Sequence, residues 1–331
     1  MTAPIEVSGG EAEAQPEAVL VGVERKAIEG RSLGQIAWLR FKRDKVAMAG
    51  AIVVLLLVLM AFVGPFLVGS PDQPHNDLID PVLSRPKTGI LHSGISAAHP
   101  FGLDVPAGRD LLSRIVNGAK YSLLIAFFSS MLAVVIGVFF GVIAGYFGGW
   151  VDTLIARMMD IFLAFPLLLF AIALVGVFPD KVFGLERNGL RVVLLIFIIG
   201  FFGWPYIGRI IRGQTISLRE REFVDAARSM GARAPYILLR ELLPNLWAPI
   251  LVYATLLIPT NILFEAALSF LGVGIIPPTP TWGGMLSDAT DIYQIVPHFM
   301  FFPGMAIFIT VLAFNLFGDG LRDALDPRAS R

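Results

Sequence analysis

The sequence predicts an all-α membrane protein with about six transmembrane helices, both termini in the cytoplasm and a cytoplasmic hairpin between the fourth and fifth helices. Of its 331 residues, 56% are hydrophobic and only 16% are charged, and the mean hydropathy is +0.73. Soluble domains are far more polar than this. The apolar residues also gather in long segments, each close to the roughly 20 residues that a helix needs to cross a bilayer.

Six segments are apolar enough to be predicted as spans: 46–68, 122–147, 154–178, 190–212, 246–271 and 298–318. The first is too long for the core of a signal peptide, so we expect it to be a retained anchor. Before it, residues 1–30 are rich in Glu, Ala and Gly and contain few large apolar groups. This composition predicts a disordered cytoplasmic tail.

Lysine and arginine set the expected orientation, because they concentrate in cytoplasmic segments next to the spans. Four of them crowd the start of the first span: Arg40, Lys42, Arg43 and Lys45. Counting crossings from a cytoplasmic N-terminus places 69–121 outside, 213–245 inside and the C-terminus inside. Five arginines in 213–245 agree with that placement, whereas cations in the longer 69–121 loop carry less weight.

Glycines and prolines within the spans predict how the helices pack. Gly137, Gly141 and Gly145 recur at a spacing of four and make one helix face of small residues. Such a face allows close packing within the chain or against another subunit. Proline inside a span removes a backbone hydrogen bond and tends to kink the helix. Pro166, Pro205 and Pro259 lie inside spans, which predicts either bundle shaping or gating.

Charged and strongly polar groups within spans are costly and mark candidate sites. Arg157 and Asp160 are three residues apart on the third span, so they share a face and can pair. Asn261 and Glu265 share a face near the outer end of the fifth span. Each pair has two interpretations, a structural contact or a place on a translocation path. A proton-coupled carrier needs a relay of such groups, and this chain has few.

The segment before the second span, "GRDLLSRIVNGAKYSLL", mixes charge with Leu111, Leu112, Ile115 and Val116. One hypothesis is a short helix along the outer membrane surface, within a platform for an external protein. The other is a simple continuation of the second span toward the outside.

The charged stretch "EFVDAARSMGARAPYILLRELLP" between the fourth and fifth spans predicts two short helices joined by a tight turn. Phe223, Ala226, Ala227 and Met230 recur at i, i+3, i+4 and i+7, which predicts one apolar stripe on the first helix. The polar side chains opposite that stripe are Glu222, Asp225, Arg228 and Ser229.

Glycine and proline set the expected limits of the two short helices. Gly231 follows where a helix closes with a left-handed residue, and Pro235 suits the first turn of a second helix over 235–243. We expect Pro244 to end that helix and Asn245 to cap the fifth span.

The order Asp225-Ala226-Ala227, Gly231, Leu243-Pro244 resembles the cytoplasmic EAA loop of permease subunits in bacterial ABC importers. Asp225 replaces the usual Glu of that name, and Glu241 stands where many members have Ile. In that family the first helix docks into a cleft of an ATP-binding subunit and transmits its motion. The resemblance therefore implies that the 222–244 loop couples this chain to separate ATPase subunits. The implied coupling residues are Glu222, Phe223, Asp225, Ala226, Ala227, Met230, Gly231 and Pro244.

Other stretches are similar to the dipeptide, oligopeptide and nickel permease family, and within it to the second, C-type permease. They include "HPFGLD", "GYFGGWVDTLIARMMDIFLAFP", "ALSFLGVGIIPPTPTWGGML" and "NLFGDGLRDALDPR". The spacing in "DVPAGRD" is one residue longer than the family's usual pattern. The resemblance divides the chain into the 1–30 tail, a first transmembrane helix with its outer loop over 31–121, and a five-helix ABC permease core over 122–331 with the coupling loop 213–245.

The same resemblance implies a location and a set of partners. The chain would lie in the bacterial inner membrane, in contact with lipid, beside a second homologous permease. Two ATP-binding subunits and an extracytoplasmic substrate-binding protein would complete the importer. Peptides are the expected cargo, and nickel complexes, glutathione and other small solutes stay open.

Catalytic and cofactor motifs are missing from the sequence. It has no G-x-x-x-x-G-K-[S/T] phosphate loop and no cysteine, and its four histidines are scattered. Lys+Arg and Asp+Glu both number 26, so no net charge favours nucleic acid. We therefore expect a subunit that is not an enzyme and holds no cofactor, with ATP and Mg on its partners. The alternatives are a secondary transporter and a membrane scaffold without ATP coupling.

Overall fold

The computed structural model describes residues 33–326, except 82, 84, 90–91, 106, 178–180 and 183. The predicted tail 1–30 lies outside the described residues. The helices are α1 (Leu33–Arg43), α2 (Lys45–Val63), α3 (Pro65–Val68), η1 (Asn76–Leu78), α4 (Leu111–Phe147), α5 (Gly149–Ala164), α6 (Leu167–Val177), α7 (Arg187–Arg219), α8 (Glu222–Ser229), α9 (Ala234–Tyr236), η3 (Ile237–Leu242), α10 (Leu243–Phe270), α11 (Trp282–Ala289) and α12 (His298–Leu325). Two short antiparallel hairpins pair β1 (Ile79–Asp80) with β2 (Arg85–Pro86) and β3 (Lys181–Val182) with β4 (Leu185–Glu186).

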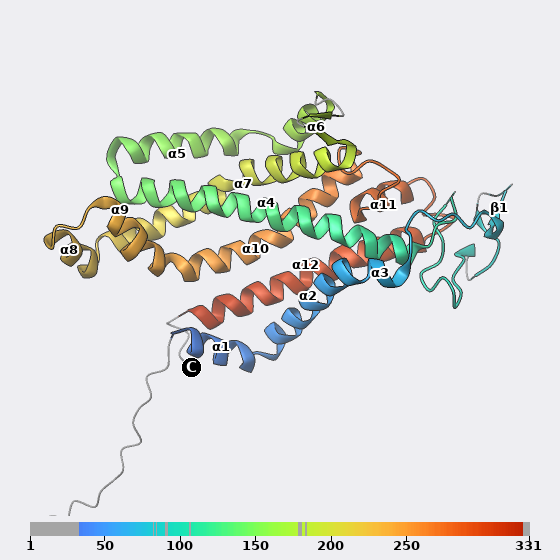
Figure 1. The fold of residues 1–331 in the computed structure, drawn as a ribbon, viewed down its shortest axis with the longest axis horizontal. Helices are drawn as coiled ribbons and strands as arrows, with labels where there is room; N and C mark the ends of the chain where they lie inside the picture. Colours follow the sequence, from blue (N-terminus) through green and yellow to red (C-terminus); the bar gives the residue numbers. More distant parts are fainter. Residues whose placement is uncertain are drawn as a thin grey trace, which may run out of the picture.

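The long helices form an elongated bundle with different structures at its two ends (Figure 1). Helices α1, α8 and α9 lie at one end with the C-terminal end of α12, and we call this the hairpin end. The segment with β1, together with α11, lies at the opposite end, which we call the loop end. The hairpin and both ends of the described chain therefore share one end of the bundle.

In the described part of the chain, five helices are long and apolar enough to cross a membrane, and the bent pair α5 and α6 is a sixth candidate if it is counted as one crossing. The prediction of about six spans agrees with this. The prediction of a continuous third span over 154–178 was wrong, because α5 and α6 meet at an angle of 77°. The break falls at Phe165, whose backbone is extended, since the ring of Pro166 disfavours helical geometry in the residue before it. Pro205 and Pro259 lie inside the continuous helices α7 and α10.

Helix α4 begins at Leu111, earlier than predicted, and runs without a break to Phe147. Asp110 caps its start by accepting a hydrogen bond of 2.7 Å from the Ser113 amide. The hypothesis of a separate interfacial helix is therefore wrong, and the stretch continues the second span. At 1.5 Å per residue, its 37 residues measure about 55 Å, more than the roughly 30 Å of a bilayer core.

The close packing of α4 against α7 depends on the predicted glycine face. An ideal Cβ on Gly137 would lie 2.8 Å from the Trp204 carbonyl oxygen, and one on Gly141 would lie 2.7 Å from that of Gly208. Gly145 is equally crowded by α7. These distances are shorter than any real side chain tolerates, so the face serves packing within the chain, as one of the two hypotheses held.

Candidate coupling and translocation sites

The hairpin is held against the end of α4. Arg219, the last residue of α7, donates hydrogen bonds of 3.2 Å to the carbonyl oxygens of Gly145 and Tyr146 near the end of α4. In α8, the Arg228 guanidinium lies 5.5 Å from the centre of the Tyr146 ring, a distance within the range of cation–π attraction. The first helix of the hairpin is therefore held against the end of the bundle.

The predicted apolar stripe of α8 is divided between two faces. Ala227 is 2% exposed and packs in a cluster with Val224, Ile237 and Leu242. Ala226 is exposed, and Met230 is 82% exposed. The prediction that Ala227 belongs to a single docking stripe was therefore wrong. Ile237 and Leu242, which follow the turn, cover Val224 and Ala227. The outward face of α8 consists of Glu222, Asp225, Ala226, Ser229 and Met230.

The turn after α8 has the predicted glycine geometry. Gly231 has φ +82°, in the left-handed region, which a glycine adopts without a steric penalty. The amide of Ala232 donates 3.0 Å to the Ala227 carbonyl oxygen, and the amide of Gly231 donates 2.9 Å to that of Arg228. Nothing lies within 4 Å of an ideal Cβ on Gly231, so backbone conformation alone favours glycine here.

Pro244 does not end the second helix, contrary to the prediction. Residues Ala234–Phe270 form one helical stretch, and Ile237–Leu242 within it are a π-helix. The wider turns of a π-helix accommodate Pro244, whose backbone nitrogen has no hydrogen to donate. Asn245 was expected to cap the start of a helix, but its side-chain amide instead donates 2.7 Å back to the Glu241 carbonyl oxygen.

Asn261 and Glu265 lie between α10 and α4, where they make structural contacts. The Asn261 amide donates to the hydroxyl oxygens of Ser129 at 3.2 Å and Ser130 at 2.8 Å. The Glu265 side chain is fully buried and accepts a 2.7 Å hydrogen bond from the Ser269 hydroxyl. In this conformation neither residue faces an open path, which favours the structural one of the two interpretations.

Arg157 and Asp160 lie on an exposed face of α5. Their charged groups are 3.7 Å apart, while Asp160 accepts a closer contact of 2.5 Å from Arg209 of α7. Sequence reasoning missed Arg209, although an arginine inside the apolar 190–212 segment was a visible signal. It also missed Arg212 of α7, which pairs with Asp152 of α5 nearer the hairpin end.

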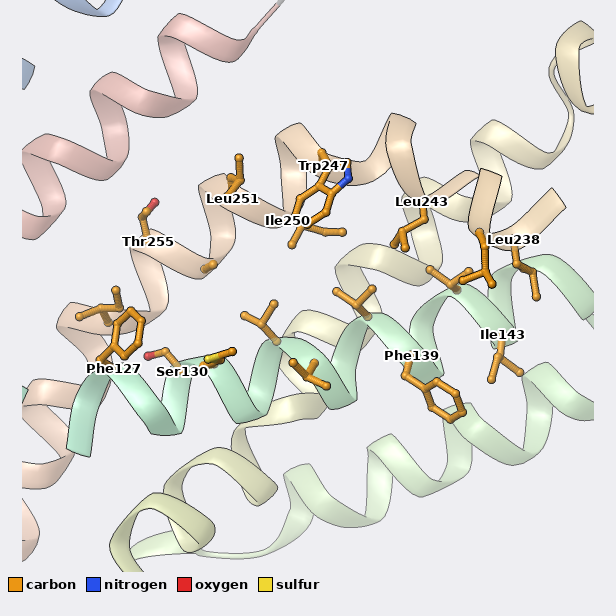
Figure 2. Close-up of a pocket in the computed structure, with 18 of the residues that line it drawn as sticks. Phe127, Ser130, Phe139, Ile143, Leu238, Leu243, Trp247, Ile250, Leu251 and Thr255 are labelled. Carbon is orange, nitrogen blue, oxygen red and sulfur yellow. The ribbon is translucent and has the colours of Figure 1, made fainter. Parts of the chain in front are cut away.

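A large apolar groove of about 880 Å³ runs between α4 and α10. Figure 2 shows Phe139 and Ile143 of α4 on one wall and Leu243, Trp247 and Leu251 of α10 on the other. Charged cargo would lose its hydration in such a groove without gaining polar partners. The groove therefore suits hydrocarbon, from protein or lipid, better than it suits a zwitterion.

At the loop end, a buried ionic network ties the outer loop to the bundle. The Asp104 carboxylate is completely buried and lies 2.6 Å from Arg109 and 3.4 Å from Arg114. Arg114, near the start of α4, also donates 3.3 Å to the Pro278 carbonyl oxygen in the segment before α11. Partial burial raises the pKa of Asp288 on α11, and the Arg114 charge opposes that shift.

Two of the outer-loop histidines lie together. The rings of His75 and His99 are 4.7 Å apart, and Nδ1 of His99 lies 2.8 Å from the Asp110 carboxylate. Among the described residues, no three His, Cys, Asp or Glu side chains are grouped so that they could hold a metal ion.

Two family models match the chain. Residues 137–331 match the binding-protein-dependent transport system inner membrane component, and residues 32–85 match the N-terminal transmembrane domain of oligopeptide transport permease C. Together they include the hairpin, α5, α7 and the first membrane helix.

Curated relatives resemble the chain over most of its length. The dipeptide transport system permease protein of Alkalihalophilus pseudofirmus is 41% identical over 88% of this chain and 89% of the relative. The glutathione transport system permease protein of Pectobacterium atrosepticum is 40% identical over 88% and 90%. A solved chain of the MetNI methionine ABC transporter has a TM-score of 0.48 and 19% identity, over 64% of this chain and 96% of that one. By its family models and relatives, the chain belongs to the binding-protein-dependent transport system inner membrane components, as a C-type permease of a bacterial ABC importer that crosses the inner membrane several times.

Proposed function

We propose that this permease imports small peptides, using ATP hydrolysed by two separate subunits. Permeases that are about 40% identical to it in sequence are named for dipeptide and glutathione transport, and glutathione is itself a peptide. A second homologous permease completes the translocation path, and an extracytoplasmic binding protein delivers the cargo. The alternatives, a secondary transporter and a membrane scaffold, predict no dependence of uptake on ATP.

The outward face of α8 is the observation that carries the coupling role. It presents Ala226 and the 82% exposed Met230 beyond the end of the bundle, where a small side chain permits close approach of another protein. Acidic Glu222 and Asp225 flank these residues. Because α8 contacts the end of α4 and continues through the Gly231 turn, α9 and η3 into α10, a force applied to this face would reach two membrane helices.

Replacement of Ala226 by tryptophan tests this role in the reconstituted complex. The variant should insert and assemble with the partner permease, because residue 226 points away from the hairpin's own core. Uptake should be lost, and ATP hydrolysis should no longer respond to the loaded binding protein. The Ala226→Ser variant, which stays small, should behave as the wild type.

Ala227→Trp is a poor probe of docking, since its indole would enter the packed cluster around Val224 and disturb the hairpin itself. Normal stimulation of ATP hydrolysis in Ala226→Trp would show that the outward face is not the coupling surface. Uptake that persists without ATP would instead favour a secondary transporter.

A further inference from the structure

One stripe along α5 is polar although it lies within a membrane-crossing segment. Thr153, Arg157 and Asp160 follow one another at spacings of four and three residues, so they share a helix face. All three are exposed. The exposed apolar side chains of Leu154 and Ile161 lie at the edge of this face, next to Arg157.

A second polar stripe lies on α7, next to the first. Tyr206, Arg209, Gly213 and Ser217 recur at spacings of three, four and four residues, and all are exposed. The 2.5 Å contact between Arg209 and Asp160 joins the two stripes. We call Thr153, Arg157, Asp160, Tyr206, Arg209 and Ser217 together the polar strip.

The polar strip reaches well into the bilayer. Phe147 and Trp150 are exposed at the turn between α4 and α5, and aromatic residues of this kind mark a membrane–water interface. At 1.5 Å per residue, Arg157 and Asp160 lie about 12 and about 16 Å along α5 from Gly149. Charged side chains at such depth face protein or water, because contact with lipid tails is too costly.

The charges of the strip favour an anion. Arg157, Asp160 and Arg209 carry two positive charges and one negative charge, and Asp160 is already engaged by Arg209 at 2.5 Å. The Arg157 side chain is 77% exposed, and its guanidinium comes no closer than 3.7 Å to the Asp160 carboxylate. Its planar guanidinium can therefore form paired hydrogen bonds with a carboxylate.

We propose that the polar strip faces a water-filled path and that Arg157 contacts the carboxylate of the cargo as it passes. This inference rests on the proposed importer function and narrows the cargo to molecules with a free carboxylate. The apolar groove between α4 and α10, on other helices, then faces hydrocarbon, and the path runs along α5 and α7.

Single cysteines in this cysteine-free chain test the water-filled path. The complete importer in nanodiscs is treated with a charged, water-soluble methanethiosulfonate reagent. Thr153→Cys and Arg157→Cys should be modified quickly. Val135→Cys and Phe139→Cys, on the α4 wall of the apolar groove and likewise exposed in the isolated chain, should be modified slowly. Equal, slow modification at all four positions would mean a dry or lipid-covered strip and would overturn the proposal.

Substitution of Arg157 tests the cargo contact, with dialanine and glutathione as transported probes. Loss of a charge-assisted hydrogen bond should lower uptake about tenfold in Arg157→Gln, while Arg157→Lys keeps the charge and most of the uptake. ATP hydrolysis stimulated by the loaded binding protein should persist in both, because the hairpin is unchanged. Unchanged uptake in Arg157→Gln would refute the contact between Arg157 and the cargo carboxylate, even if the cysteine measurement shows that the polar strip faces water.

These results separate two kinds of failure. A wild-type complex without ATP-dependent uptake of either probe would count against the proposed importer function. The cysteine measurement needs no transport, so it still decides whether the strip faces water.

Discussion

At the scale of single residues, glycines allow the long helices α4 and α7 to pack closely together. Gly137 and Gly141 bring α4 so near to α7 that carbonyl oxygens of α7 occupy the space of their absent Cβ atoms. Helix association within a membrane depends on such van der Waals contact, since lipid gives no hydrophobic force between helices. Asn261 adds side-chain hydrogen bonds between α10 and α4.

We therefore expect Gly141→Ala to destabilise the permease, although alanine favours a helix over glycine. Its methyl group would lie 2.7 Å from the Gly208 carbonyl oxygen, and overpacking of this kind costs about 1–3 kcal/mol. Thermal unfolding of the purified protein in detergent measures the loss. Gly213→Ala on α7, where nothing lies within 4 Å, is the matched control. It should unfold at the wild-type temperature or slightly above it, and an equal loss in both variants would refute the packing explanation.

At the scale of elements, the outer loop depends on one buried carboxylate. Asp104 accepts hydrogen bonds of 2.7 Å from both the amide and Nε of Arg109, and it also faces Arg114 of α4. The Asp104 side chain thus fixes the outer loop to the start of α4. Arg114 in turn connects α4 to the segment before α11 through its hydrogen bond to Pro278. Phe101 adds an apolar contact to this structure by stacking on Phe302 of α12 at 4.3 Å.

Asp104→Asn should loosen this loop, because it leaves two arginines beside a neutral group. Removal of one partner from a buried ionic pair typically costs about 3–5 kcal/mol. We expect faster proteolysis within 72–110 and a lower unfolding temperature, with the bundle still inserted. Asp77→Asn, at an exposed position of the same loop, should change neither measurement. Resistance of Asp104→Asn to proteolysis equal to the wild type would show that the network is dispensable.

At the scale of the whole molecule, the hairpin, α1 and the end of α12 lie together at one end of the bundle (Figure 1). The basic residues before α2 predict that this end is cytoplasmic. The orientation has a direct test, because the chain contains no cysteine of its own.

Ser217→Cys should resist an impermeant thiol reagent in intact cells and react after the cells are opened. Leu83→Cys, an exposed position in the turn between β1 and β2, should react in intact cells. The reverse pattern would mean that the charge rule assigns this chain the wrong orientation.

Hydropathy predicted the five long membrane helices and the apolar segment of the bent pair α5 and α6, because bilayer thickness fixes the length of an apolar segment. It could not predict the break at Phe165, since proline is found both at breaks and inside continuous helices such as α7. The hairpin was predicted from Gly231 and the α8 periodicity, but the burial of Ala227 depends on Ile237 and Leu242. Arg209 became significant only when the fold brought it to Asp160.

The π-helical segment Ile237–Leu242 replaces what would otherwise be a loop between the hairpin and the membrane. Because no loop interrupts the stretch Ala234–Phe270, we expect a movement of α8 to pass into α10 through continuous helical backbone. The 37 residues of this stretch measure about 55 Å, so a rigid tilt of about 5° would move the far end by about 5 Å. A small tilt at the hairpin would thus become a displacement at the loop end as wide as a peptide backbone.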